Sequence, residues 1–214
     1  MLLADERREL CRIGRRMVET GVVLGAAGNI SVRRGDLVAI SPAGMRLEQM
    51  TPEDPPVIDL TGAVVEGTRE PSSETPMHLA IYEETRAPAI VHTHSTHGAV
   101  IAATMTELPP IHYYTLLLGG VVRVAEYATY GTPELAVNVR KAMAGGMRAA
   151  LMANHGGVAI GADLEDAFEN ALILEWLCGV YVRARSIGEP RALTDEQLRR
   201  AAERGLRPKP LPQE

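Results

Sequence analysis

The chain has 214 residues, of which 46% are hydrophobic and 23% charged, proportions typical of a globular protein with one substantial core. Its formal net charge of −5 argues against non-specific binding to nucleic acid. We identify no apolar stretch of the length that a membrane span requires, and the charged segment Met1–Arg7 is unlike a signal peptide. The two cysteines, Cys11 and Cys178, fall in predicted helices, so we expect reduced thiols in a cytoplasmic protein.

The N-terminal part of the chain is predicted to form one helix followed by hairpins. Apolar residues at helical spacing predict a helix over 4–20, and a glycine-rich loop follows at 25–29. Two hairpins come next, each made of two short strand-like runs joined by a turn: 30–32 with 37–40, and 57–60 with 63–65.

The remainder of the chain alternates between predicted helices and strands. The helices are expected at 75–86, 96–103, 132–144, 164–186 and 194–204. The strands are expected at 89–92, 121–124, 149–153 and 158–160. This pattern predicts one α/β domain over 1–214, with helices covering a mainly antiparallel sheet and an extended tail at 205–214.

Two histidines, His92 and His94, flank Thr93 directly after the apolar run 89–91. Side chains two residues apart on an extended backbone point to the same face, so both imidazoles could bind one metal ion. His155 follows another apolar run, and Glu74 lies in a polar loop before a predicted helix. Three histidines and a carboxylate suit Zn²⁺ or a similar divalent ion, provided that the fold brings them together.

The other histidines and the lysines are interpreted differently. His97 is predicted to lie on a helix, either beside the metal site or facing solvent, and His78 on the helix after Glu74. The only two lysines, Lys141 and Lys209, fall on an amphipathic helix and in the proline-rich tail. Neither resembles the desolvated lysine of a Schiff-base enzyme, so carbanion chemistry here would need a metal ion.

Three loops could bind an anion, namely 25–29, 41–44 and the serine pair Ser72 and Ser73. Ordinary turns and helix capping explain the same residues at least as well. Aromatic side chains are few. Tyrosines such as Tyr113 could act as general acids, although packed aromatics are the favoured interpretation for Tyr113, Tyr114, Tyr127 and Tyr130. Trp176 and Phe168 are predicted to lie in the core.

Taken together and in order, seven segments resemble the class II (zinc) aldolase and adducin family, and within it the fuculose-phosphate aldolases. The segments are Gly28-Asn29-Ile30-Ser31-Val32-Arg33, Ser41-Pro42-Ala43-Gly44, Pro71-Ser72-Ser73-Glu74, Val91-His92-Thr93-His94, Ile111-His112-Tyr113, Tyr127-Ala128-Thr129-Tyr130-Gly131-Thr132 and Asn154-His155-Gly156.

The resemblance implies a three-layer α/β/α fold and a homotetramer with active sites between subunits. It implies that His92, His94 and His155 hold Zn²⁺, with Glu74 as the catalytic base close enough to ligate the metal, and that Tyr113 of a neighbouring subunit handles the proton at the aldehyde oxygen. The implied substrate is a ketose 1-phosphate such as L-fuculose 1-phosphate, cleaved to dihydroxyacetone phosphate and an aldehyde. The substrate phosphate would be held by Gly28, Asn29, Gly44, Ser72 and Ser73.

The sequence departs from the family pattern in two places. Ala26 and Ala43 stand where relatives often carry a hydroxyl that meets the phosphate, and the tail lacks a tyrosine. Other reactions of the family therefore stay open: 4-epimerisation of a pentulose 5-phosphate, decarboxylation and dehydration. A non-catalytic scaffold of the adducin type is disfavoured because all three histidines and Glu74 are present.

Overall fold

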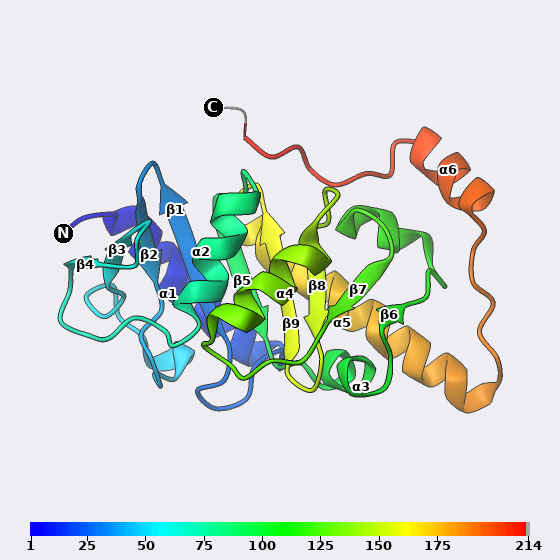
Figure 1. Cartoon of the computed structure of the whole chain (residues 1–214), viewed down its shortest axis with the longest axis horizontal. Helices are drawn as coiled ribbons and strands as arrows, with labels where there is room; N and C mark the ends of the chain where they lie inside the picture. Colours follow the sequence, from blue (N-terminus) through cyan, green and yellow to red (C-terminus); the bar gives the residue numbers. More distant parts are fainter. Residues whose placement is uncertain (213–214) are drawn as a thin grey trace.

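A computed structural model describes residues 1–212 of the chain, and in them one mixed sheet forms the middle layer (Figure 1). The strand order is β4-β3-β2-β1-β5-β9-β8-β7-β6. Neighbouring strands are antiparallel except for the parallel pair β7 and β8. The strands are β1 (Asn29–Arg34), β2 (Leu37–Ile40), β3 (Val57–Asp59), β4 (Val64–Glu66), β5 (Ala89–Thr93), β6 (Glu107–Leu108), β7 (Val122–Ala125), β8 (Ala149–Met152) and β9 (Gly156–Gly161).

Helices cover both faces of this sheet, which confirms the predicted α/β/α layering. One face packs against α1 (Ala4–Glu19), α3 (Thr96–Thr104) and α5 (Leu164–Ile187), and the other against α2 (Thr75–Glu84) and α4 (Pro133–Met143). Alternation along the strands separates the two cores. In β5, for example, Ala89 and Val91 join the first core, whereas Ile90 joins the second.

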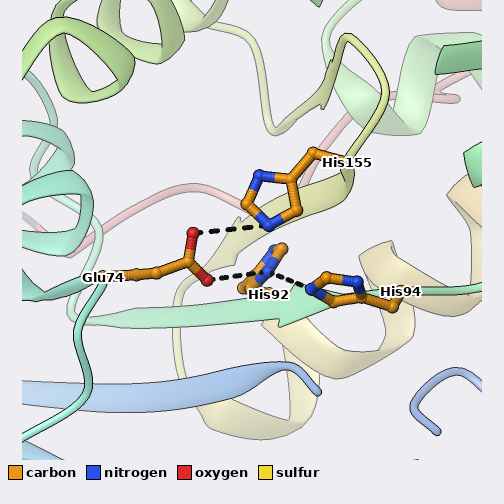
Figure 2. A group of neighbouring side chains, drawn as sticks. All are labelled: Glu74, His92, His94 and His155. Carbon is orange, nitrogen blue, oxygen red and sulfur yellow. Dashed lines mark hydrogen bonds and ion pairs between the residues drawn. The ribbon is translucent and has the colours of Figure 1, made fainter. Parts of the chain in front are cut away.

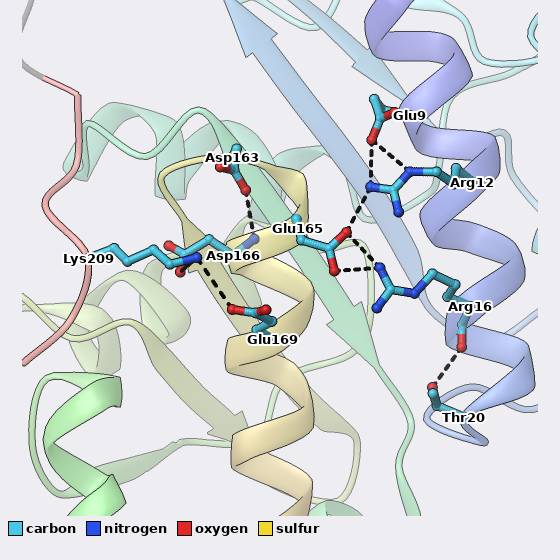
Figure 3. A network of polar contacts seen from close by, with 9 residues as sticks. All are labelled: Glu9, Arg12, Arg16, Thr20, Asp163, Glu165, Asp166, Glu169 and Lys209. Carbon is cyan, nitrogen blue, oxygen red and sulfur yellow. Dashed lines mark hydrogen bonds and ion pairs between the residues drawn. The ribbon is translucent and has the colours of Figure 1, made fainter.

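Salt bridges connect α5 to α1 and to the C-terminal segment (Figure 3). Arg12 and Arg16 of α1 both contact the carboxylate of Glu165, at 2.8 and 2.5 Å. After α6 (Asp195–Glu203), the chain returns along the sheet, where Lys209 Nζ lies 3.3 Å from Asp166 Oδ1 and the Lys209 carbonyl accepts from Arg148. Residues 206–212 contain no helix or strand, and 213–214 of the predicted tail lie outside the described residues.

The structure corrects several predictions from the sequence. The short strand β6 and the 3₁₀ helix η2 (Tyr113–Leu118) were not predicted, and α2 ends at Glu84, two residues earlier than expected. Phe168 is fully buried as predicted, but Trp176 is 47% exposed, so its assignment to the core was wrong. Trp176 packs instead against His112, the N-cap residue of η2, with ring centroids 4.8 Å apart. Within residues 1–212, no helix has the length and apolar character needed to cross a membrane.

We expect Gly161→Ala to destabilise the packing of α5 on β9. A β-carbon at this position would lie 2.2 Å from the Ala167 nitrogen, so the helix would have to move away from the strand. Overpacking of this kind should lower the free energy of unfolding by about 1–3 kcal/mol, measured by urea titration. Gly188→Ala is the matched control, because open space surrounds that residue. Equal stability of the two variants would contradict this account.

Candidate active site

The candidate site begins where β5 ends between β1 and β9. His92 pairs with Asn29 on one side and with Val158 on the other, so its side chain is fully buried and points to the α2 face. The ring is oriented by its Nδ1, which donates to the Gly157 carbonyl at 2.9 Å. In the neutral imidazole, this contact leaves the lone pair on Nε2.

His94 and His155 come to the same point from different directions. His94 lies just beyond β5, where its backbone N–H donates to the Val22 carbonyl at 3.1 Å. His155 lies in the turn between β8 and β9, which Asn154 closes with a positive φ of 56°. A β-carbon on the next residue, Gly156, would lie 2.2 Å from the Thr93 carbonyl oxygen, so only glycine permits this approach of β9 to β5.

The three imidazoles and the Glu74 carboxylate converge, as Figure 2 shows. Each of the four residues offers one ligand atom, and these atoms all lie within 4.8 Å of one another. Glu74 Oε2 is 2.9 Å from His92 Nε2, and Glu74 Oε1 is 3.4 Å from His155 Nε2. His92 Nε2 and His94 Nε2 are 2.9 Å apart. The structure therefore brings together the four residues that were predicted as metal ligands; their role as ligands stays a prediction.

The chemistry of these atoms fits a divalent cation. With its Nδ1–H committed to Gly157, His92 turns Nε2 toward a carboxylate oxygen and another ring nitrogen, and loss of the Nε2 proton would leave a lone pair there for a cation. Among the described residues, the buried Glu74 Oε1 has no hydrogen-bond partner. Nitrogen and carboxylate donors gathered around one point suit Zn²⁺ and related transition metals, and the hydrogen bond to Gly157 is the usual outer support of a metal-binding histidine.

The same crowding shifts the pKa values of the cluster. Burial would raise the pKa of the Glu74 carboxyl, but the charges of His92 and His155 and the Asn29 hydrogen bond lower it well below its usual range. Burial and the nearby His92 lower the pKa of His94 to about 3 and that of His155 to about 4. At neutral pH the carboxyl is therefore ionised, and His94 and His155 are neutral. Burial would lower the pKa of His92, but the Glu74 carboxylate raises it, so a metal ion would compete with a proton at that ring.

A cavity of about 370 Å³ opens directly over this cluster. All five residues predicted to bind phosphate line it: Gly28, Asn29, Gly44, Ser72 and Ser73. They lie at three loop ends that are far apart in the sequence and close together in the fold, since Ser72 N–H donates to the Ser41 carbonyl. Ala26 and Ala43 line the same cavity, so the two expected hydroxyls are replaced there by methyl groups.

Three further polar residues, which the sequence did not assign to the site, line the cavity. Tyr127 and Tyr130 are 62% and 67% exposed, so their interpretation as packed aromatics was wrong. Asn154 joins them from the turn before His155. A signal was available for the tyrosines, because both belong to a segment that resembles the family, but no local pattern separates a packed tyrosine from one that faces a cavity.

Tyr113 does not line the cavity of its own chain. It lies in η2, is 47% exposed, and packs against His112 with ring centroids 4.3 Å apart. His97 is also separate from the cluster, since its Nδ1 pairs with Glu175 at 2.7 Å. Lys141 and Lys209 are both exposed, and hydrogen bonding to Asp166 raises the pKa of Lys209, so neither lysine occupies the desolvated pocket that Schiff-base chemistry needs.

Comparison with known proteins gives a consistent result. Residues 8–182 match the sequence model of the class II aldolase and adducin N-terminal domain. The chain is 40% identical over 207 residues to 5-deoxy-D-ribulose 1-phosphate aldolase of Bacillus thuringiensis serovar kurstaki, covering 95% of this chain and 97% of that protein. It is 36% identical to L-fuculose phosphate aldolase of Escherichia coli K12, with 85% of each chain covered.

Solved structures agree with the sequence matches. A structure described as L-fuculose 1-phosphate aldolase superposes with a TM-score of 0.91 at 43% identity, covering 96% of this chain and 98% of the other. YgbL of Klebsiella pneumoniae, described as a putative aldolase/epimerase/decarboxylase, superposes with a TM-score of 0.84 at 27% identity, covering 92% and 97%. The fold is therefore shared with these proteins.

We expect the metal-free protein to lose stability as pH falls from 6.5 toward 4. His94 and His155 have pKa values of about 3 and 4 in the fold and 6.5 when exposed, so in this window the unfolded chain binds protons that the folded chain does not. Urea unfolding at a series of pH values measures the effect. His155→Asn should show a shallower slope, and a stability that is independent of pH between these values would contradict the assigned burial.

Proposed function

Because the chain belongs to the class II aldolase and adducin family and is an enzyme of the lyase class, we propose that it catalyses metal-dependent retro-aldol cleavage of a ketose 1-phosphate. The products would be dihydroxyacetone phosphate and an aldehyde. One observation carries the proposal: an ionised carboxylate and three imidazoles converge at the base of a cavity. Much of the rest of the cavity wall comes from short polar and glycine-rich loops.

The proposed metal ligands are His92, His94 and His155, with Glu74 as a fourth. A divalent ion bound there, Zn²⁺ in our proposal, would act as a Lewis acid toward the carbonyl group of the substrate. Glu74 is the proposed catalytic base. Its carboxylate is ionised, buried and positioned by Asn29, so it can accept the proton released when the C4 hydroxyl becomes a carbonyl and deliver it to C3 once the C3–C4 bond breaks.

Phosphate binding is assigned to Gly28, Asn29, Gly44, Ser72 and Ser73. Glycines allow backbone N–H groups to approach an anion closely, and the serine hydroxyls lie just before α2, whose N-terminal end favours negative charge. This arrangement would fix the 1-phosphate end of the substrate and leave its carbonyl carbon over the cluster. Orientation of this kind is a major contribution of the protein to the rate.

The names of two relatives narrow the class of substrates that we propose. The relatives from B. thuringiensis and E. coli K12 are described as acting on 5-deoxyribulose 1-phosphate and fuculose phosphate respectively. Both are ketose 1-phosphates whose far end is a methyl group rather than a hydroxymethyl group. We propose a deoxyketose 1-phosphate of this type, with L-fuculose 1-phosphate among the substrates, so that the second product would be lactaldehyde or a similar small aldehyde.

Tyr113 is proposed to handle the proton of the C4 oxygen from a neighbouring subunit of a homotetramer. Tyr113 and Trp176 are each 47% exposed, and with His112 and Tyr114 they form one aromatic surface outside the cavity of their own chain. A surface of this kind is typical of a protein–protein contact. In such an assembly each phenol would complete the site of the adjacent copy.

Decarboxylation is a second candidate function, and one relative supports it. The chain is 32% identical over 208 residues to 3-oxo-tetronate 4-phosphate decarboxylase of Haemophilus influenzae. Decarboxylation also leaves negative charge beside a carbonyl group, so the same cluster could serve it. A 4-epimerase acting on a pentulose 5-phosphate would use the same bond cleavage but rejoin the two fragments.

Replacing the base should separate metal binding from turnover. We expect Glu74→Gln to lower kcat by at least about 100-fold, because a neutral amide cannot accept the proton, whereas the three histidines remain to hold metal. Elemental analysis and thermal unfolding of the same sample serve as controls. Turnover of Glu74→Gln within a few-fold of the parent protein would remove Glu74 from this role.

A substrate screen tests the reaction itself. The panel contains L-fuculose 1-phosphate, 5-deoxyribulose 1-phosphate, pentulose 5-phosphates and a 3-oxo acid phosphate. Dihydroxyacetone phosphate is detected with glycerol-3-phosphate dehydrogenase and NADH, and we expect it from the two deoxyketose 1-phosphates only. Interconversion of pentulose 5-phosphates without released triose would instead identify an epimerase, and released carbon dioxide a decarboxylase. Exhaustive chelation should abolish the activity, and Zn²⁺ should restore it.

A further inference from the structure

A buried chain of hydrogen bonds leads from the candidate site into the core between β1 and α2. Asn29 Nδ2 donates to Glu74 Oε2 at 2.9 Å, and Asn29 Oδ1 lies 2.6 Å from His78 Nε2. On the other side of the ring, His78 Nδ1 lies 2.7 Å from Ser31 Oγ, which lies 2.7 Å from the hydroxyl of Tyr82. All five residues are at most 6% exposed.

Regular secondary structure creates this chain. Asn29 and Ser31 are two residues apart on β1 and so share one face of the sheet. Glu74, His78 and Tyr82 are four residues apart in succession, at the start of α2 and along it, and so share one face of the helix. The strand face and the helix face meet, and each polar side chain finds its partners across that contact.

The direction of every hydrogen bond follows from the carboxylate at the end. An ionised Glu74 can only accept, so Asn29 must present its NH₂ group to it and its oxygen to His78. His78 Nε2 must then carry a proton. Burial, with the nearby charge of His92, lowers the pKa of His78 to about 3, so the ring is neutral and its Nδ1 accepts from Ser31. Tyr82 is left as the donor to Ser31.

Polar side chains that fill the space between a strand and a helix contribute less to the free energy of unfolding than apolar side chains would. Buried polar groups gain little net stability even when every partner is present, and a fully satisfied network mainly enforces one arrangement. Apolar side chains surround it, since Ile81 and Ile90 are fully buried in the same core. The arrangement that this network enforces is the orientation of the Asn29 amide, which lines the cavity and contacts Glu74.

We propose that His78 is a positioning residue, which holds the Asn29 amide so that its NH₂ group, and not its oxygen, faces the Glu74 carboxylate. Without a donor at the position of His78 Nε2, the amide can turn over and set its oxygen against the carboxylate. Glu74 would then be displaced from its position against His92. The kinetic part of this inference rests on the proposed function, but the orientation of the ring and the amide does not.

Two conservative variants test the position of the donor. In His78→Gln the side-chain amide reaches the place of Nε2 and can still donate to Asn29, whereas the shorter amide of His78→Asn reaches only the place of Nδ1. We expect His78→Asn to lower kcat for a ketose 1-phosphate by about 10–100-fold and His78→Gln by at most about threefold. Thermal unfolding and zinc content of both variants are measured on the same samples.

A spectroscopic readout is independent of any substrate. Long-range ¹H–¹⁵N spectra of the ¹⁵N-labelled, zinc-loaded protein report which ring nitrogen of each histidine carries hydrogen. The His78 signals are assigned by their absence from His78→Gln. We expect a neutral ring with hydrogen on Nε2, and in Ser31→Ala we expect the Nδ1 signal to shift while Nε2 keeps its hydrogen.

The outcomes are distinct. A ring with hydrogen on Nδ1 would overturn the inference, because Asn29 would then have to turn its oxygen toward Glu74. Equal losses of kcat in the two variants, or no loss in either, would also overturn it, since the first indicates only a packing role and the second no role. If the parent protein cleaves no ketose phosphate, the proposed function fails, and the tautomer of His78 alone decides this inference.

Discussion

The pairing of β5 with β1 and β9 is the constraint on which the candidate site depends. It places His92 beside Asn29 on one neighbour and beside Val158 on the other, at the end of a fully buried strand. The approach is so close that a side chain on Gly156 would collide with the Thr93 carbonyl. The turn carrying His155 therefore closes directly over the end of β5. The imidazole of His155 meets those of His92 and His94 because β9 pairs with β5.

Around that point, the fold gathers nitrogen and carboxylate groups that suit a divalent cation. Nε2 of His92, Nε2 of His94 and the oxygens of Glu74 face one another at the base of the cavity, where His92 and Glu74 are buried. The electrostatic consequence is a carboxyl with a lowered pKa beside His94 and His155, which titrate only in acid. Stability of the protein, metal affinity and catalysis are thus expected to depend on the same four side chains.

The two cores contribute differently to this site. The core under α1, α3 and α5 is apolar and supports the sheet, whereas the core under α2 contains the hydrogen-bond chain from Tyr82 to Glu74. Local patterns predicted the helix and the strand that form the second core. They did not predict that His78 would be fully buried, because a histidine occurs on both the buried and the exposed face of a helix. Trp176 shows the opposite error, since helical spacing favoured burial and the side chain lies beside η2 at the surface.

By itself, the sequence predicted most of the alternating elements, the layering of helices on a mainly antiparallel sheet, and four candidate metal ligands. These follow from short-range periodicity and from the chemistry of each residue type, both of which are visible along the chain. Only the tertiary structure decided that Tyr127, Tyr130 and Asn154 line the cavity and that Tyr113 does not. Those placements depend on strand order and on contacts between segments far apart in sequence, which local spacing does not encode.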